Sequence, residues 1–206
     1  MKLKKIAAAV LTVAMMFSMT GCNAITIDGE ENVATGEGES VGNGSIGFSV
    51  STLNNPFFVT LSEGAKDKAD ELGVDLIVVD AGDETAKQTS DIEDLISRNI
   101  SVLIVNPVDS DAVAPAVKDA VSKGIKVISV DRVVNGVDVD CAIASDNVAG
   151  AEAATEYLAS LIGEGAKVAE LQGTTGASAT IDRGQGFHNV ADKKLNVVAS
   201  QTGDFN

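Results

Sequence analysis

Short apolar segments recur along the chain from residue 45 onward. Each segment is rich in valine and isoleucine and stays apolar at consecutive positions, which is typical of strands covered on both faces in a parallel sheet. We therefore predict strands at Ile46–Val50, Val74–Val79, Val102–Val105, Lys126–Val130, 141–146 and Lys167–Leu171, with a further strand pattern near Val197–Ser200.

Helical patterns separate the predicted strands. After the first strand, Asn55 and Pro56 predict a helix start, because asparagine caps helices and proline suits their first position. Gly73 predicts the end of this helix. Its apolar residues recur every three or four positions and form one stripe, made of Phe58, Leu61, Ala65, Ala69 and Leu72. Further helices are predicted at 83–98, 111–123, 147–162 and 177–192.

The alternation of strands and helices predicts an α/β fold with a doubly wound parallel sheet. The segment CAIASD at 141–146 ends one such series, since the next helix and KVAELQG begin the pattern again. We therefore expect a domain boundary near Asp146, with a first lobe at 45–146 and the start of a second lobe at 147–206.

The first residues have the layout of a secretory signal peptide, predicted at 1–21. Three lysines precede an apolar run, Ile6–Met19, that is short for a membrane-spanning helix, although a short membrane anchor is the alternative. The sequence Met19-Thr20-Gly21-Cys22 resembles a bacterial lipobox. That resemblance implies that Cys22 is acylated and holds the protein at a membrane surface outside the cytoplasm. Residues 22–44 are rich in glycine, glutamate and asparagine and predict a flexible acidic tether.

Charge and composition exclude two classes of function. The chain has 30 acidic and 15 basic residues, a net charge of −15, and three of its lysines lie before Cys22. Removing that segment lowers the net charge to −18, which repels phosphate backbones and opposes a nucleic-acid partner. One histidine and two cysteines are too few for a zinc site, so no metal is expected.

Cys141 lies in an apolar segment and is predicted to be a buried small side chain.

Polar and aromatic side chains follow several predicted strands. Ligands of open parallel sheets bind at the carboxyl ends of the strands, so these residues are candidates for a site. The chain has neither GxGxxG after its first strand nor GxxxxGK[ST] anywhere, so no nucleotide cofactor is expected. The candidates are Ser51, Asn55, Phe57 and Phe58 after the first strand, Asn106 after the third, Asp131 and Arg132 after the fourth, and Arg183 after KVAELQG.

This set of side chains suits a neutral polyol. A carboxylate accepts hydrogen bonds from neighbouring hydroxyls, a guanidinium donates a two-pronged fork, and a phenyl ring packs on the C–H face of a sugar. Each residue also has a simpler interpretation. Asn55 can be only a helix cap, Asp131 and Arg132 can be a solvated ion pair, and both phenylalanines can be core residues. Because only Phe58 falls on the helix stripe, we expect Phe57 to point into a cleft.

Several segments resemble a known family when taken in order: STLNNPFF, NPVDSDAV, VDR, IASDN, GEGAKVAELQG and RGQGF. They are similar to the periplasmic sugar-binding proteins of ABC importers, and most similar to the D-ribose-binding branch. The resemblance implies two similar α/β lobes, joined by crossing strands, that close on a sugar. It also implies that aromatic rings sandwich the sugar while Asp, Asn and Arg side chains bind its hydroxyls. Its sugar contacts correspond to Ser51, Asn55, Phe57, Phe58, Asn106, Asp131, Arg132 and Arg183.

The resemblance also implies a setting for the protein. We expect a binding protein and not an enzyme, lipid-anchored outside the cytoplasm, that delivers a ribose-like monosaccharide to the permease subunits of an ABC transporter. A chemoreceptor is a further partner that the family allows. Chains of the family continue beyond the counterpart of Asn206, so we expect this sequence to be an N-terminal fragment with an incomplete second lobe.

Three alternatives remain open. The ligand can be another pentose, allose or a furanose signal molecule, because single hydroxyls and ring size are not encoded in these motifs. Sugar-responsive transcriptional regulators share the fold, but they begin with a DNA-binding helix-turn-helix, where this chain has its apolar leader. A sugar hydrolase using Asp131 or Asp146 would need two carboxylates facing one bond. Arg132 directly follows Asp131 and favours its ionised form, which cannot act as an acid.

Overall fold

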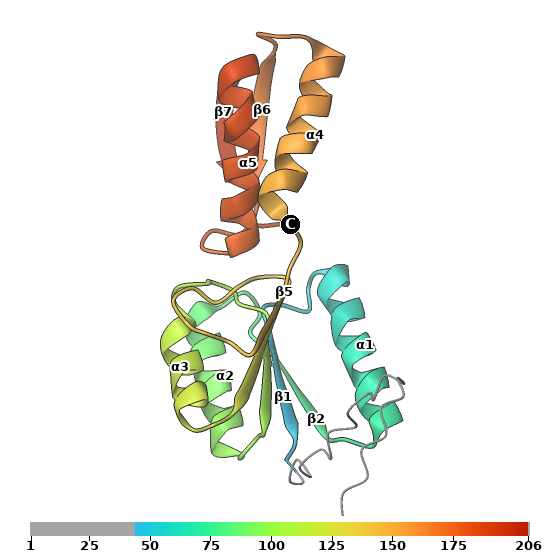
Figure 1. Cartoon of the computed structure of the whole chain (residues 1–206), viewed down its shortest axis with the longest axis vertical. Coiled ribbons are helices and arrows are strands. Elements are labelled where there is room, and N and C mark those ends of the chain that lie inside the picture. Colours follow the sequence, from blue (N-terminus) through green and yellow to red (C-terminus); the bar gives the residue numbers. More distant parts are fainter. Residues whose placement is uncertain (1–43, 206) are drawn as a thin grey trace, which may run out of the picture. The chain divides into compact units, whose positions relative to one another are not determined.

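The computed structural model describes residues 44–205. Residues 46–143 contain a five-stranded parallel sheet (Figure 1). The strands lie in the order β2-β1-β3-β4-β5, and each neighbouring pair is parallel. This arrangement confirms the predicted α/β class with a parallel sheet. The strands are β1 (Ile46–Val50), β2 (Leu76–Asp80), β3 (Val102–Val105), β4 (Lys126–Val130) and β5 (Cys141–Ile143).

Helices cover both faces of this sheet, and together they form the part that we call the first lobe. Helix α1 (Pro56–Leu72) lies on one face, and helices α2 (Thr85–Ser97) and α3 (Ala114–Ser122) lie on the other (Figure 1). The sequence signals for α1 are confirmed. The side chain of Asn55 accepts a hydrogen bond from the Phe57 amide, 2.9 Å away, and Gly73 ends the helix in a left-handed conformation with φ 65°.

The two faces of the first-lobe sheet bury separate cores. On the α1 face, Phe48 and Val50 of β1 pack with Phe58. The other face buries a larger cluster from α2, α3, β3 and β4. Leu72 is wrongly predicted as part of the buried stripe, because it is 62% exposed at the last position of α1, where the chain turns towards β2. The larger cluster includes Ile92, Leu95, Leu103, Val105, Val113, Val117 and Val127.

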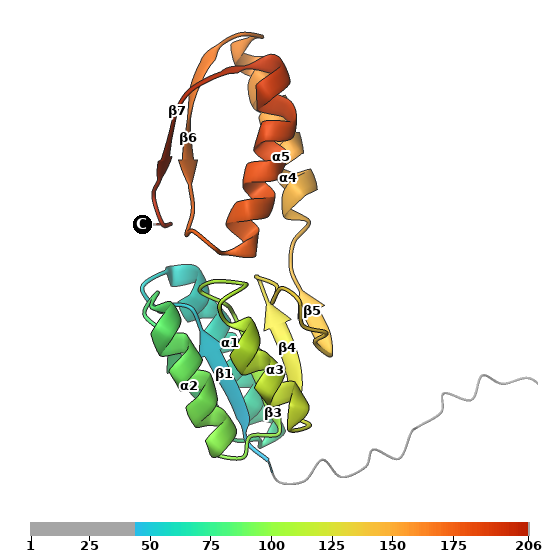
Figure 2. The same ribbon diagram turned by 90° about the vertical axis from the view of Figure 1, so that its left-hand side faces the viewer.

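A second, two-stranded parallel sheet follows, and we call this part the second lobe. It contains α4 (Asn147–Ile162), β6 (Lys167–Gln172), α5 (Ser178–Lys194) and β7 (Asn196–Thr202). Figure 2 shows both helices on the same side of β6 and β7. Leu171 of β6 is 74% exposed, so the prediction of a strand covered on both faces is wrong for β6, and Val198 of β7 is 57% exposed as well.

Two further expectations need correction. Cys141 is exposed, not buried, because it begins β5 at the edge of the five-stranded sheet. The strand predicted at 141–146 is also shorter than expected, since β5 ends at Ile143.

None of the helices within residues 44–205 combines the length and apolarity that crossing a membrane requires. The predicted signal peptide, the lipidation site Cys22 and nearly all of the predicted tether lie outside the described residues.

Candidate functional site

Six of the eight predicted site residues line one cavity of about 230 Å³. They come from the start of α1, the loop after β4, and α5, which agrees with the rule that sites form at the carboxyl ends of strands. The volume is below the range of about 300–1,000 Å³ that holds drug-sized ligands, so a smaller molecule suits it. The lining residues are Asn55, Phe57, Phe58, Asp131, Arg132 and Arg183, together with Ala179 and Phe205.

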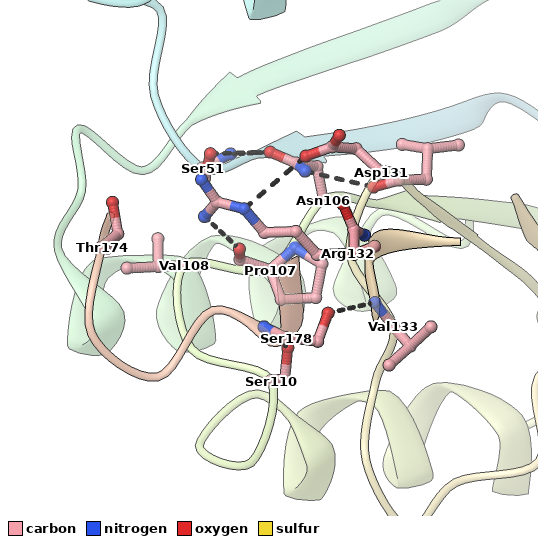
Figure 3. Close-up of polar contacts among 12 residues, drawn as sticks. Ser51, Asn106, Pro107, Val108, Ser110, Asp131, Arg132, Val133, Thr174 and Ser178 are labelled. Atoms are coloured by element: carbon pink, nitrogen blue, oxygen red, sulfur yellow. Dashed lines mark hydrogen bonds and ion pairs between the residues drawn. The ribbon is translucent and has the colours of Figure 1, made fainter. Parts of the chain in front are cut away.

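Ser51 and Asn106, the other two predicted site residues, are not among the residues that line this cavity. Both are fully buried and bind each other (Figure 3). The Asn106 side-chain oxygen accepts hydrogen bonds from the Ser51 hydroxyl at 2.6 Å and from the Ser51 amide at 3.2 Å. The Asn106 side-chain nitrogen donates to the Val130 carbonyl at 3.1 Å. These bonds tie together the ends of β1, β3 and β4, from which the site loops begin.

Arg132 is the most buried charged residue at the cavity, with 2% of its surface exposed. Its Nη1 donates to the Pro107 carbonyl at 2.7 Å, and its guanidinium carbon lies 5.2 Å from the ring centre of Phe58. Its Nε has no hydrogen-bond partner within the part of the chain that the structure describes. Because buried N–H groups are nearly always paired, this one is suited to a ligand in the cavity.

Charges of both signs surround the Arg132 guanidinium. Burial lowers the pKa of Arg132, whereas the carboxylates of Asp131 and Asp83 raise it and the Arg183 cation lowers it. The backbone of Asp131 is left-handed, with φ 63°, a conformation that aspartate adopts more readily than most residues. The site therefore offers guanidinium donors and a carboxylate acceptor to the same small volume.

The two adjacent phenylalanines differ as the sequence predicts. Phe58 is 3% exposed within the α1 core, whereas Phe57 is 55% exposed. Their ring centres lie 5.2 Å apart in an edge-to-face arrangement with an interplanar angle of 75°. Both rings reach the cavity, so Phe58 belongs to the core and to the cavity wall at once. Asn55 likewise caps α1 and lines the cavity.

The second lobe contributes residues from α5 and from the segment after β7. Arg183 donates from Nε to the Asn147 side chain at 2.8 Å, which orients it on α5. Sequence reasoning missed Phe205, whose ring centre lies 6.0 Å from the Arg132 guanidinium carbon, and Ala179. Phe205 comes three residues after the end of β7, so the same strand-end rule applied to this last strand would have found it.

The start of α5 is hydrogen-bonded to loops of the first lobe (Figure 3). Ser178 donates from its amide to the Ser110 hydroxyl at 3.1 Å and accepts from the Val133 amide at 2.9 Å. The Ser110 amide donates to the Gly176 carbonyl at 2.9 Å. Val133 directly follows Arg132, so these bonds hold the start of α5 beside the loop that carries Asp131 and Arg132.

A larger cavity of about 520 Å³ lies in the second lobe among α4, α5 and β6. It shares Arg183 and Phe205 with the smaller cavity, but its helix walls present many small residues, such as Gly150, Ala151 and Ala154. We place the candidate site in the smaller cavity because a buried, partly unpaired guanidinium, a carboxylate and three phenyl rings converge there. Across residues 44–205, no group of three His, Cys, Asp or Glu side chains is arranged to hold a metal ion.

Residues 46–206 match a family described as periplasmic binding protein domain. The chain belongs to this family. The resemblance drawn from its sequence segments is thus confirmed, and the match extends over both sheets of the periplasmic binding protein.

Curated relatives of the chain are named as ribose import binding proteins. The chain is 44% identical over 203 residues to the ribose import binding protein of Bacillus subtilis, an alignment that covers 98% of this chain and 65% of the relative. It is also 44% identical to the ribose import binding protein of Escherichia coli, over 100% of this chain and 64% of the relative. The chain therefore spans just under two thirds of the length of these relatives.

Solved structures agree on the fold. The Caulobacter myo-inositol binding protein bound to myo-inositol superposes with a TM-score of 0.75 at 33% identity, covering 80% of this chain and 57% of that one. A periplasmic solute binding protein from Actinobacillus succinogenes with bound D-allose gives a TM-score of 0.67 at 28% identity, covering 78% of this chain and 59% of that one.

Proposed function

We propose that this periplasmic binding protein captures D-ribose, or a similar monosaccharide, as the substrate-binding component of an ABC importer. The names of its relatives support a sugar ligand, and two of them at 44% identity are ribose import binding proteins. Another pentose, allose or a furanose sugar is the alternative ligand. The bound D-allose of one structural relative makes allose the first competitor to test.

The observation that carries the proposal is the unpaired Nε of Arg132 in a cavity walled by phenyl rings. A sugar hydroxyl can accept a hydrogen bond from this N–H and donate one to the Asp131 carboxylate. The exposed ring of Phe57 can cover the apolar C–H face of the sugar and exclude water from these bonds. A neutral polyol can bond to the guanidinium and to the carboxylate, whereas an anion would be repelled by the carboxylate and a hydrocarbon could form neither hydrogen bond.

A catalytic role fits the cavity less well than binding. Glycoside hydrolysis uses two carboxyl groups on either side of one bond. Asp131 is the one carboxylate among the described residues that line the cavity. The relatives that the chain matches are named as import binding proteins, which supports capture and release of an unchanged sugar.

The proposal is tested by titrating sugars in a calorimeter. D-ribose, D-allose, D-xylose, L-arabinose and myo-inositol are added in turn to the protein without its first 22 residues. Because the alignment covers 65% of the Bacillus subtilis relative, a chimera adds to the chain the part of that relative that lies outside the alignment. We expect D-ribose to bind most tightly to the chimera. Failure of all five sugars to bind either protein would contradict the proposal.

We further propose that the protein works outside the cytoplasm, held by a lipid on Cys22 and engaging the permease subunits of its importer. The lipobox-like segment and the acidic tether support this setting. A chemoreceptor is a second candidate partner. The negative net charge of the chain opposes binding of a nucleic acid. Cross-linking in membranes that contain the permease tests the first interaction, with soluble protein lacking Cys22 as its control.

A further inference from the structure

Gln88 is a buried amide that takes no part in the cavity wall. It lies in the first turns of α2 and is 1% exposed. Its Nε2 donates to the Asn106 carbonyl at 2.9 Å and contacts the Ser49 hydroxyl at 3.2 Å. Its Oε1 accepts from the Val108 amide at 2.7 Å. Both ends of one side chain are therefore bonded to the same loop, on either side of Pro107.

These two bonds of Gln88 to the loop determine the direction of the Pro107 carbonyl. Proline has no N–H with which to anchor its own position. The Pro107 carbonyl and the Val108 N–H belong to one planar trans peptide, since the described residues contain no cis peptide bond, and they point in opposite directions. Because the Val108 N–H points at Gln88, the Pro107 carbonyl points away from α2. In that direction it accepts the hydrogen bond from Nη1 of Arg132 (Figure 3).

We propose that Gln88 is a positioning residue for the sugar site, because it aims the Pro107 carbonyl that holds the Arg132 guanidinium at the cavity wall. The part of this inference that concerns sugar rests on the proposed function, whereas the placement of Arg132 does not. The Nη1 bond to Pro107 is the one hydrogen bond of the Arg132 guanidinium among the described residues, and its other contacts are the ion pair with Asp131 and the rings of Phe58 and Phe205. The orientation of the guanidinium therefore depends on that bond. If the Pro107–Val108 peptide is free to rotate, the Arg132 guanidinium adopts several orientations. A ligand must then order the guanidinium on binding, which lowers its affinity.

Two substitutions at Gln88 and one control separate positioning from stability. Gln88→Leu has a similar size and removes every hydrogen bond of the side chain. In Gln88→Glu the buried carboxyl favours its protonated form, which keeps an acceptor for the Val108 N–H and a donor for the Asn106 carbonyl. The control is Ile92→Val, one turn further along α2, which trims a fully buried core residue that can form no hydrogen bond with the loop.

Two measurements are made on each variant. The first is the dissociation constant for D-ribose, by calorimetry, in the protein and in the chimera described above. The second is the NMR resonance of the Arg132 Nε–H without sugar, identified by its loss in Arg132→Lys. We expect Gln88→Leu to weaken ribose binding about tenfold and to shift or broaden the Arg132 resonance. Gln88→Glu should restore both towards wild type, and Ile92→Val should lower the melting temperature without changing either.

The outcomes decide the two proposals separately. An Arg132 resonance that is the same in Gln88→Leu and wild type would overturn the positioning role, whatever the protein binds. If wild type and chimera bind no sugar, the proposed function fails, and the resonance alone still decides the role of Gln88. Equal loss of affinity in Gln88→Leu and Ile92→Val would mean that Gln88 acts only through the stability of the fold, which would also overturn the positioning role. If Gln88→Leu does not fold, Gln88→Met replaces it, since methionine adapts to irregular core sites.

Discussion

The Asp131 carboxylate lies 3.7 Å from Nε of Arg132, close enough for an ion pair but too far for a hydrogen bond. The backbone of Asp131 between the two side chains is left-handed, with φ 63°. Each keeps polar atoms for a third group in the cavity that both line. Strained backbone of this kind is concentrated at functional sites, which agrees with a binding role for the pair.

Asp131→Asn is predicted to weaken D-ribose binding about tenfold or more while leaving the fold stable. Asparagine tolerates the left-handed backbone, but it lacks the negative charge and one acceptor for sugar hydroxyls. Asp131→Ala should lose affinity and also about 1–2 kcal/mol of folding free energy, because alanine resists this conformation. Calorimetry and thermal melts of both variants test the pair. Unchanged affinity in both variants would mean that Asp131 and Arg132 form only a local ion pair, which contributes little energy.

Truncating Phe58 is predicted to lower stability, whereas truncating Phe57 is predicted to lower sugar affinity. Phe58→Ala should reduce the free energy of unfolding by about 3–5 kcal/mol, because it opens a hole in the α1 core. Phe57→Ala should leave the urea midpoint almost unchanged, since its ring is 55% exposed, and should weaken sugar binding. Phe57→Leu is the control that keeps apolar bulk without a flat ring. If Phe57→Ala binds D-ribose as wild type does, the ring is not a sugar contact.

The fold of the first lobe could be predicted because its signals are local. The Asn55–Pro56 start and the Gly73 end of α1 depend on conformational preferences that each residue carries by itself. Continuous apolar runs likewise marked β1, β3 and β4, with the same bounds as in the structure. Exposure was less predictable. Cys141 and Leu171 lie in apolar segments, but whether a helix covers them depends on the tertiary arrangement.

The candidate site was only partly predictable, for a geometric reason. The strand-end rule places Asn106 at the correct edge of the sheet, but it does not say where the side chain points. In the structure that side chain binds Ser51 and the Val130 carbonyl. The role of Gln88 cannot be recognised in the sequence, because two of its three partners are backbone groups of a loop about twenty residues away and the third is the Ser49 hydroxyl on β1.

Cys22 is predicted to carry a diacylglyceryl group after secretion. The three early lysines, the apolar run and Thr20-Gly21-Cys22 supply the processing signal, and the acyl chains would hold the protein at a membrane. Mass spectrometry of protein from a bacterial host should find the lipid on an N-terminal Cys22, and Cys22→Ala should abolish it. An intact Met1, or cleavage elsewhere with a free thiol at Cys22, would contradict the prediction.

Gly176→Ala is predicted to destabilise the protein more than Gly165→Ala. Both glycines are left-handed, with φ 83° and 74°, so alanine costs about 1–2 kcal/mol at either position. At Gly165 an added Cβ would meet open space, whereas at Gly176 it would clash with the Asp109 carboxylate. That carboxylate accepts from the amides of Asp111 and Ala112 at 2.9 and 2.8 Å, so its displacement breaks further bonds. Urea unfolding should separate the two variants, and equal losses would mean that Asp109 adapts freely.

His188 is the single histidine of the chain and connects α5 to β6. Its Nδ1 lies 2.9 Å from an Asp192 carboxylate oxygen, and its Nε2 lies 3.5 Å from one of Glu170. The hydrogen bond with Asp192 raises the pKa of His188 above its ordinary 6.5, with a smaller contribution from Glu170, while burial opposes both. The protonated imidazole is thus bound more favourably in the folded protein than in the unfolded chain.

This raised pKa predicts how stability depends on pH. The contribution of His188 is fully present below the pKa of the unfolded chain, near 6.5, and is lost as the pH rises through the higher pKa of the folded protein. The urea midpoint of wild type should therefore fall relative to that of His188→Gln as the pH rises from below 6.5 through the raised pKa of the folded protein. The effect should be modest, because the side chain is 42% exposed and water screens both carboxylates. Since the substitution removes the only imidazole, the difference between the two pH profiles isolates its contribution from those of the many carboxylates. An imidazole that titrates by NMR at or below 6.5 in the folded protein would contradict the prediction, because the carboxylates would then not stabilise its charge.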